Sequence, residues 1–161
     1  MTSKRSYTIT LDNNKSEKEA MSFLMASDLN FLNPDKDSRK LIMETLGIEK
    51  KYARAFDLIR IPGHTSLEQI IELDRTSEIV LVELKTTKKK LVNLPFGFFF
   101  GATESEFELA RQLGKNYEFC FVSLHVDTCG YVLMTLDELN RIIKTKRIQY
   151  QINIQTTANN L

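Results

Sequence analysis

A nearly continuous apolar run at residues 119–126 most strongly limits what this chain can fold into. A strand that is apolar on both faces has to be covered on both faces, as in the centre of a sheet between helices. Before this run, Thr103 and Glu106 have the spacing of a helix capping box. The residues that follow provide one apolar helix face: Phe107, Leu109, Ala110 and Leu113. The pattern predicts a helix that ends at Gly114 and leads into a buried central strand.

Hydrophobic periodicity predicts the remaining elements as an alternation of helices and strands. Helices are expected at residues 17–26, from residue 37 or 38 to Gly47, and at residues 136–146. Strands are expected at residues 6–11, 56–61, 69–75, 79–86, 96–100, 131–135 and 148–154. This order predicts an α/β, or mixed α+β, domain with a mixed central β-sheet flanked by helices.

The first two of these helices have apolar residues at helical spacing. Ser16 and Glu19 form a second capping box before the first helix. The residues expected to face the core are Ala20, Met21, Leu24 and Met25 in the first helix, and Leu41, Ile42 and Leu46 in the second. Cys120 lies in the apolar run and is expected to be a small core residue.

Length and overall charge restrict the class further. The 161 residues suit one domain with a short N-terminal arm and a C-terminal extension of one helix and one strand. The 22 Lys+Arg balance 21 Asp+Glu, which excludes a generally polybasic nucleic-acid binder. Two cysteines are too few for a disulfide framework, and no apolar segment of signal-peptide or membrane-span length is visible. We therefore expect a cytoplasmic protein.

Charges are unevenly distributed within this balance. Residues 66–83 hold five acids and one arginine, whereas residues 85–90 hold four lysines and no acid. Four bases and no acid follow between Leu139 and the C-terminus. The distribution predicts an acidic patch suited to a cation, together with basic patches suited to phosphate.

The candidate site lies at residues 68–90. A two-residue hairpin loop at Thr76 and Ser77 would give the strand pair one apolar face. The opposite face would then hold the charged residues Glu68, Glu72, Asp74, Glu83 and Lys85. Glu83 and Lys85 point the same way, about 7 Å apart along the strand. Since they close an apolar strand, they occupy the kind of position where α/β folds build sites; the alternative is a solvated edge-strand face.

Carboxylates beside a lysine suit metal-dependent phosphodiester hydrolysis. Mg²⁺ prefers carboxylate oxygens as protein ligands. The ion activates water and stabilises charge on the phosphate. A neighbouring ammonium group can hold the attacking water and the scissile phosphate. Two acids and one lysine on rigid strands are the minimum set for this chemistry.

Two short segments of the sequence resemble a known signature. Asp57 in Phe-Asp-Leu-Ile, followed by Glu83 and Lys85 in Val-Glu-Leu-Lys-Thr-Thr, is similar to the motif of the PD-(D/E)xK, or restriction-endonuclease-like, nuclease superfamily. Residues 103–111 and 117–124 resemble the helix and strand that follow the motif in many members, so the resemblance covers roughly residues 38–126. It implies a restriction-endonuclease-like core and Mg²⁺-dependent cleavage of double-stranded DNA, with Mn²⁺ as a substitute ion. The products would end in 5′-phosphate and 3′-hydroxyl groups.

The resemblance also assigns roles to residues. Asp57 and Glu83 would bind the metal, and Lys85 would position or activate the water. Phe56 stands where the motif has proline, and residues 62–67 form an apparent insertion, so the identity of the first acid stays open. The hairpin register gives Glu72 and Glu68 as alternatives, either as third ligands or as plain surface charge. The accessory candidates are Glu44 and Gln112 on the helices before and after the motif, and an exposed surface position is the favoured alternative for both. Asp74 would lie about 13 Å along the neighbouring strand, too far to share the ion.

Basic residues outside the motif are the candidate DNA contacts. They are Lys88, Lys89 and Lys90 after the motif, and Arg141, Lys144, Lys146 and Arg147 in the last predicted helix. The alternative for both groups is a solvated surface. The aromatic residues Phe96, Phe98, Phe99 and Phe100 are expected in the core or in a subunit interface, in preference to a base-stacking platform.

The combined expectation is a restriction-type or homing-type endonuclease. Cutting both strands with one active site per chain favours a homodimer or a larger homo-oligomer. Two alternatives stay open: a non-catalytic DNA-binding or assembly subunit on the same fold, and a structural or interaction domain in which the E-x-K pattern is accidental.

Overall fold

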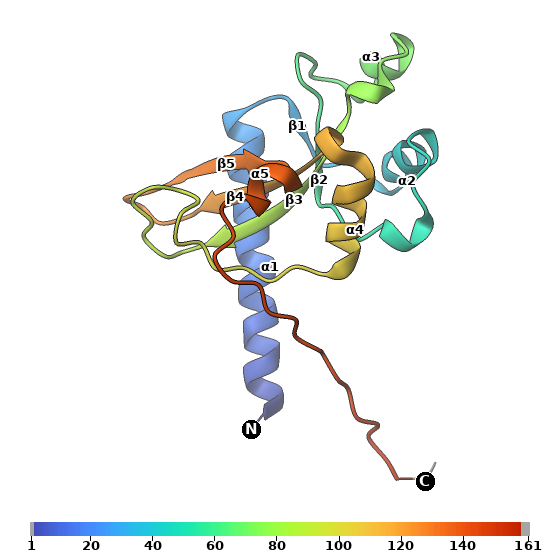
Figure 1. Ribbon diagram of the computed structural model, residues 1–161. Coiled ribbons are helices and arrows are strands. Elements are labelled where there is room, and N and C mark those ends of the chain that lie inside the picture. Colours follow the sequence, from blue (N-terminus) through green and yellow to red (C-terminus); the bar gives the residue numbers. More distant parts are fainter. Residues whose placement is uncertain (1, 159–161) are drawn as a thin grey trace.

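The computed structural model describes residues 2–158 and, within this range, the side chains from Lys15 onward. Five strands form one sheet in the order β1-β2-β3-β4-β5 (Figure 1). Their bounds are β1 (Phe31–Leu32), β2 (Leu58–Arg60), β3 (Val80–Thr87), β4 (Tyr117–Ser123) and β5 (Gly130–Met134). Strands β3 and β4 are parallel and the other neighbouring pairs are antiparallel. The predicted class, a mixed α+β fold with a mixed sheet, is confirmed.

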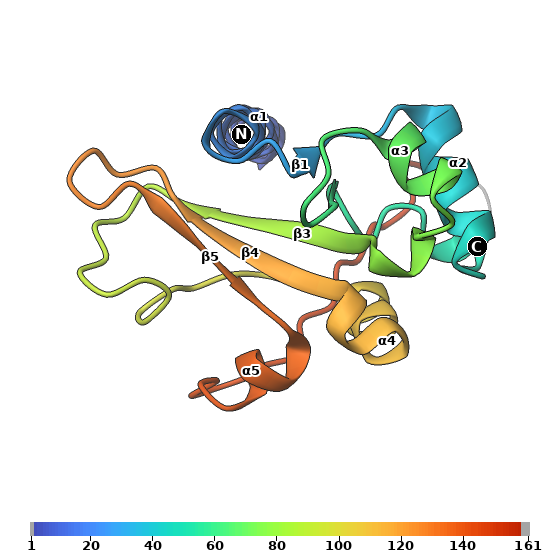
Figure 2. The same ribbon diagram turned by 90° about the horizontal axis from the view of Figure 1, so that it is seen from above.

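Helices lie on both faces of this sheet (Figure 2). Helix α1 (Thr2–Ser27) covers one face, whereas α4 (Glu104–Leu113) and α5 (Leu136–Asn140) cover the other. Helices α2 (Lys36–Thr45) and α3 (Leu67–Glu72) lie together at one end of the sheet. The short 3₁₀ helices are η1 (Lys50–Tyr52), η2 (Thr76–Glu78) and η3 (Gly114–Asn116).

Strands β3 and β4 are apolar on both faces because each face meets a different part of the core. On the α4 side, Leu81 and Phe119 join a buried cluster that includes residues from α2 to α5. On the α1 side, Val82 packs in a second cluster with Ala20 and Leu24. This two-sided burial explains the continuous apolar run that the sequence shows, and it confirms the predicted central strand.

Helix α4 begins and ends as the sequence predicts. Thr103 Oγ1 accepts a hydrogen bond from the Glu106 N–H at 3.3 Å, and Glu106 Oε2 accepts one from the Thr103 N–H at 3.1 Å. The helix ends at Gly114, whose φ of 55° suits a residue without a side chain. Helix α4 therefore provides the crossover that the parallel strands β3 and β4 require.

The predicted hairpin at residues 69–86 is wrong in its first half. Residues 67–72 form helix α3, which Ser66 caps by accepting a hydrogen bond from the Gln69 N–H at 3.4 Å. Leu67 and Ile70, three residues apart, are buried on one helical face. The chain leaves this helix through Asp74 at a φ of 53°, and η2 occupies the expected hairpin loop. The predicted face of five charged residues therefore does not exist.

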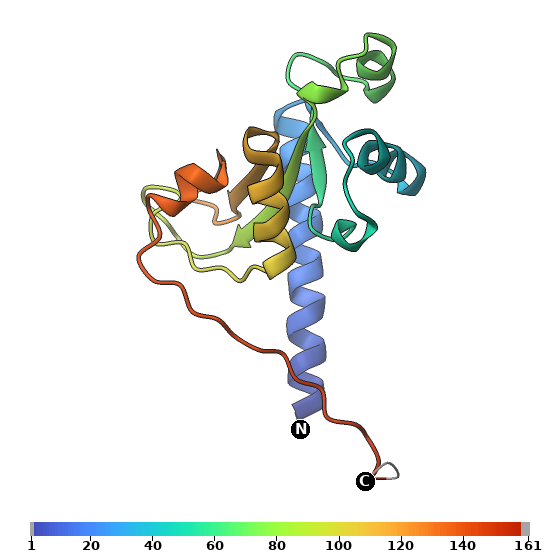
Figure 3. The same cartoon turned by 45° about the vertical axis from the view of Figure 1, so that its right-hand side comes forward.

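The remaining corrections concern three predicted strands that do not form, the length of the last helix and two residues expected in the core. Residues 6–11 belong to α1, which begins at Thr2, so Ser16 starts no helix. Residues 96–100 and 148–154 form no strand, and α5 ends at Asn140, well before residue 146. The segment after α5 runs away from the sheet as an extended chain (Figure 3). Met25 and Leu41, expected in the core, are exposed because α1 and α2 turn these positions outward.

The contact of α1 with the sheet can be tested at Leu24, which has no exposed surface. We expect Leu24→Ala to lower the free energy of unfolding by about 2–5 kcal/mol, the usual cost of such a cavity. Leu29→Ala is the matched control because 70% of Leu29 is exposed, and a change within about 0.5 kcal/mol is expected. Urea denaturation of both variants measures the difference, and equal stability would contradict the docking of α1.

Candidate active site

A cavity opens where β3 extends beyond its short neighbour β2. The β2–β3 ladder stops at the pair Leu58 and Val82, whereas β3 continues to Thr87. The space beside this stretch of β3, on the side where β2 has ended, has a volume of about 450 Å³. Its lining comes from α1, the start of β2, β3 and the loop before α4: Glu17, Asp57, Glu83, Leu84, Lys85, Thr86, Phe99, Phe100 and Gly101. The three motif residues expected to carry chemistry therefore line one cavity.

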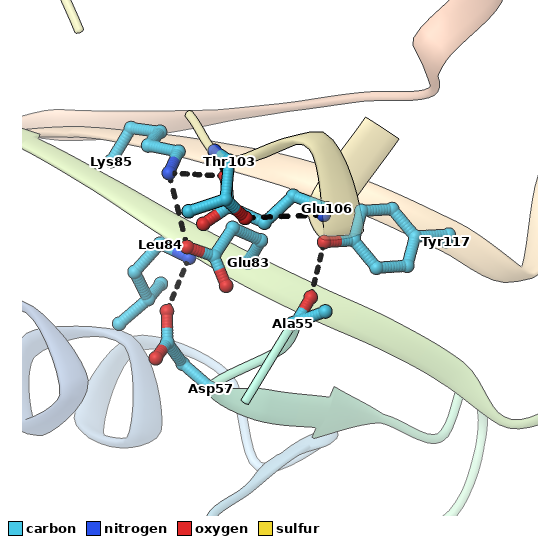
Figure 4. Close-up of polar contacts among 8 residues, drawn as sticks. All are labelled: Ala55, Asp57, Glu83, Leu84, Lys85, Thr103, Glu106 and Tyr117. Atoms are coloured by element: carbon cyan, nitrogen blue, oxygen red, sulfur yellow. Dashed lines mark hydrogen bonds and ion pairs between the residues drawn. The ribbon is translucent and has the colours of Figure 1, made fainter. Parts of the chain in front are cut away.

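Asp57 takes the place that the next residue of a longer β2 would have. Its N–H donates to Val82 O at 2.8 Å, and its Oδ2 accepts a hydrogen bond from the Leu84 N–H at 2.8 Å (Figure 4). The carboxylate thus satisfies a backbone donor that the end of the ladder leaves free. This contact fixes Asp57 beside the segment of β3 that holds Glu83 and Lys85.

The chain leading to Asp57 is held from two sides. Arg39 of α2 donates to Phe56 O at 2.8 Å and to Asp57 O at 2.9 Å, and its guanidinium lies 4.2 Å from the centre of the Phe56 ring. The Tyr117 hydroxyl of β4 donates to Ala55 O. Since two separate elements, α2 and β4, hold the consecutive carbonyl groups of Ala55, Phe56 and Asp57, the position of Asp57 is set by tertiary structure and not by local sequence.

Lys85 is buried between two carboxylates (Figure 4). Its Nζ donates to Glu83 Oε1 at 3.0 Å and to Glu106 Oε2 at 2.9 Å. Glu83 and Glu106 are 7% and 6% exposed. Glu106 belongs to the first turn of α4, so the capping box that starts this helix also supplies the second partner of Lys85. Burial lowers the pKa of Lys85, but the two carboxylates outweigh this effect and raise it, so the ammonium stays charged.

The surroundings of Glu83 disfavour the ionised form of its carboxyl group. Burial, and then the nearby charge of Asp57, raise the pKa of Glu83 from 4.5 to about 9, although Lys85 acts in the opposite direction. Its second oxygen, Oε2, is buried and has no hydrogen-bond partner. A buried carboxylate oxygen without a donor is unusual in a native protein and indicates a place for a ligand.

Glu17 of α1 is a further carboxyl group in the cavity. Burial is the main cause that raises the pKa of Glu17 to about 7, and a hydrogen bond with Asp57 and the charge of Asp57 add to it. The sequence does contain a signal for this residue. Glu17 stands three and seven residues before Ala20 and Leu24, which are fully buried in the part of α1 from Lys15 onward, so it lies on the face that meets the sheet. Glu106 was visible in the sequence only as a helix cap.

The arrangement fits a hard divalent cation. Among the described side chains, those of residues 15–158, no group of three or more His, Cys, Asp or Glu is arranged to hold a metal ion. Mg²⁺, however, often binds through one or two carboxylates and keeps several of its water molecules. Asp57 and Glu83 suit such a site, because a cation would give Glu83 Oε2 a partner and would offset the repulsion between the carboxylates.

The other predicted acidic and accessory residues do not line the cavity. Glu68 and Glu72 are exposed on α3, and the hairpin that would have placed them beside Glu83 is absent. Glu44 is exposed on α2, with its carboxylate 4.0 Å from Lys40 Nζ. Gln112 is exposed on α4. Their predicted roles depended on a local geometry that the fold does not have.

The predicted DNA contacts are exposed. Lys88, Lys89 and Lys90 directly follow β3, and Lys90 Nζ lies 3.1 Å from Asp127 Oδ2. Because α5 is short, the other four cations lie in the irregular chain after it: Arg141, Lys144, Lys146 and Arg147. The Lys146 ammonium lies 4.4 Å from the centre of the Phe107 ring.

Comparison with family models, with curated proteins and with solved structures gives no match for this chain. No helix in the described part of the chain is both long and apolar enough to cross a membrane. The activity of the protein therefore has to be inferred from the geometry of the cavity.

The raised pKa of Glu83 predicts how stability depends on pH. The folded protein holds the Glu83 proton more tightly than the unfolded chain does between pH 4.5 and about 9. The contribution of Glu83 to the free energy of unfolding therefore falls as the pH rises through this range, by up to about 1.4 kcal/mol per pH unit. Glu83→Gln removes the titration, so its Tm should exceed that of the wild type more at about pH 8 than at about pH 5.

Thermal unfolding monitored by circular dichroism measures this difference. Glu72→Gln is the matched control, because it removes an exposed carboxylate outside the cavity and should keep the pH dependence of the wild type. A Tm difference between Glu83→Gln and the wild type that is the same at both pH values would contradict the raised pKa.

Proposed function

We propose that this protein is a Mg²⁺-dependent DNA endonuclease of the PD-(D/E)xK type, with a restriction or homing role. The observation that carries the proposal is the cavity itself. Asp57, directly before β2, lies around one space with Glu83 and Lys85 of β3, and a buried carboxylate oxygen in this space has no partner. A resemblance in short sequence segments and an independent feature of the fold thus favour the same chemistry.

The roles of the residues follow from their contacts. Asp57 and Glu83 would hold the metal, and Glu17, which lines the same cavity, would act as a base or as a further ligand. When bound, Mg²⁺ or Mn²⁺ supplies an acidified water and neutralises charge on the phosphate. The Lys85 ammonium has three protons, and Glu83 and Glu106 accept two of them. The third can be donated to the attacking water or to a phosphate oxygen.

In the proposed reaction a water oxygen bonds to phosphorus and the bond from phosphorus to the 3′ oxygen breaks. The attacking water gives up one proton, the leaving oxygen takes up one and becomes the 3′-hydroxyl, and the phosphate stays on the 5′ end. Glu106 acts on this reaction through Lys85, because its carboxylate holds the ammonium beside Glu83. It is therefore a positioning residue.

The charges around the cavity support a phosphate-containing substrate. Carboxylates line the inside, where a cation would bind, and the exposed Lys88, Lys89 and Lys90 follow β3 directly after it. Exposed lysines can hold the phosphates that flank a cleaved bond without reading sequence. This arrangement lets a chain with a net charge of only +1 bind a polyanion at one place.

A plasmid cleavage assay tests the proposal. The wild type is expected to cut supercoiled or linear DNA with Mg²⁺ or Mn²⁺ and to be inactive with EDTA. Asp57→Ala, Glu83→Ala and Lys85→Ala should each lower the rate at least about 100-fold, because each removes a group that acts in the transition state. Glu68→Ala and Glu72→Ala are matched controls on exposed acids outside the cavity and should keep the wild-type rate.

The outcomes separate the alternatives. Equal cleavage by the wild type and the three cavity variants would contradict the site. Salt-sensitive DNA binding without cleavage would favour a non-catalytic DNA-binding or assembly subunit. If the wild type neither bound nor cut a set of DNA molecules of diverse sequence, an interaction domain with an accidental E-x-K pattern would be favoured.

We further propose that the enzyme works as a homodimer that uses its C-terminal segment. Apolar and polar residues alternate there, and the apolar ones are 78–86% exposed: Ile148, Tyr150, Ile152 and Ile154. Strand β5 is an edge of the described sheet, with no strand beyond it. An alternating segment can add to a free sheet edge by backbone hydrogen bonds. A second copy of the chain supplies that edge, and it also supplies the second active site that double-strand cleavage needs.

A charge placed on the apolar face of the segment tests this assembly. Ile152→Lys should turn a dimer into a monomer, because the lysine would be buried in the new interface. Gln151→Lys is the matched control on the neighbouring polar position and should stay dimeric. Light scattering after size-exclusion chromatography measures the mass. A monomeric wild type, or an Ile152→Lys variant that is as dimeric as the wild type, would overturn the assembly.

A further inference from the structure

Three successive phenylalanines in the loop before α4 have different surroundings. Phe98 and Phe100 both lie against Phe121 of β4, with ring centres 5.1 Å from it in each case. Their own ring centres are 6.2 Å apart. Phe99, between them, is 94% exposed. The two neighbours are thus anchored to the core, and this holds the Phe99 ring out in solvent.

The backbone of the loop contributes to this presentation. Gly97 has a φ of 85°, which side chains disfavour, and a Cβ there would lie 3.4 Å from Leu91 Cδ2. The chain therefore reverses close to the buried Leu91 immediately before the aromatic run. An exposed ring on an anchored turn loses little conformational freedom when it binds a partner.

The position of Phe99 distinguishes it from an ordinary exposed apolar residue. It lines the same cavity as Asp57, Glu83 and Lys85. Single exposed apolar side chains are common on protein surfaces and need no explanation. An exposed aromatic residue at the wall of a polar, acidic cavity is different, because it is placed to contact a substrate bound beside the three charged residues.

We infer that Phe99 stacks on a base of the DNA next to the cleaved phosphate and acts as a wedge between base pairs. The inference rests on the proposed nuclease function and deepens it. Aromatic side chains stack on bases of any sequence, and apolar wedges unstack neighbouring base pairs. The loop that presents Phe99 is preceded by Lys88, Lys89 and Lys90, which would hold the backbone while the ring enters the stack. Phe99 is therefore a DNA-positioning and specificity residue, distinct from the groups that perform hydrolysis.

The test uses the full-length protein and a duplex that spans the cleavage site mapped in the plasmid assay. The duplex carries the fluorescent base 2-aminopurine beside the cut, and EDTA prevents cleavage. Binding of the wild type should raise the 2-aminopurine fluorescence, because the base loses a stacking neighbour. Phe99→Ala should abolish this rise and weaken binding by between about 5-fold and 150-fold. Phe99→Trp should retain both properties.

Phe96→Ala is the matched control. Phe96 is 57% exposed in the same loop but does not line the cavity, so this variant should behave like the wild type. A duplex with a mismatch beside the cut is already unstacked there. Phe99→Ala should therefore lose less affinity on the mismatched duplex than on the matched one, an effect that a general folding defect would not produce.

The results separate this inference from the proposed function. If the wild type cuts DNA and Phe99→Ala matches it in binding, cleavage and fluorescence, the wedge is overturned and the nuclease proposal stands. If Phe99→Ala changes the mass in light scattering but not the fluorescence rise, Phe99 belongs to a subunit interface and the wedge is again overturned. If the wild type neither binds nor cuts DNA, both proposals fail together.

Discussion

The arrangement of this protein depends on the two ion pairs that the buried Lys85 forms with Glu83 and with Glu106. It ties the central strand β3 to the first turn of α4, and α4 connects the two parallel strands at the centre of the sheet. Buried charges are costly unless each one is paired, and this lysine is paired twice. The cluster still contains more negative than positive charge once Asp57 is included. Burial is the main cause of the raised pKa of Glu83, and the charge of Asp57 adds to it. The excess of negative charge makes the site receptive to a cation.

The centre of the fold was predictable because the sequence patterns that mark it are local: a helix capping box and strands that are apolar on both faces. The Thr103 and Glu106 capping box marks the start of α4, and continuous apolar runs mark β3 and β4. The short segment 67–75 was not predictable in the same way. Its residues Ile70, Ile71 and Leu73 suit a strand or a helix, and only the burial of Ile70 beside the exposure of the other two decides for the helix. That information belongs to the packed protein and not to the segment.

The residues of the candidate site also differ in whether local sequence or tertiary contacts determine their positions. Glu83 and Lys85 could be predicted because they stand two residues apart on one strand, so their relation survives any error elsewhere. The placement of Asp57 beside them could only be expected from the resemblance, because it depends on contacts from Arg39 and Tyr117 on other elements. Glu68 and Glu72 were chosen from a false strand register, and Glu17 was missed because α1 meets the cavity from the opposite face of the sheet.

One carboxylate oxygen of this protein accepts two hydrogen bonds that serve different parts of the structure. Glu106 Oε2 accepts hydrogen bonds from the Thr103 N–H and from the Lys85 ammonium. A glutamine at position 106 would retain an acceptor for the helix start but would leave the lysine with one carboxylate, and an aspartate would be one methylene group too short to reach both donors. The choice of residue at position 106 is thus coupled to the residues at positions 85 and 103. A lineage that changed one of the three would be under pressure to change the others, so these positions should vary together or not at all.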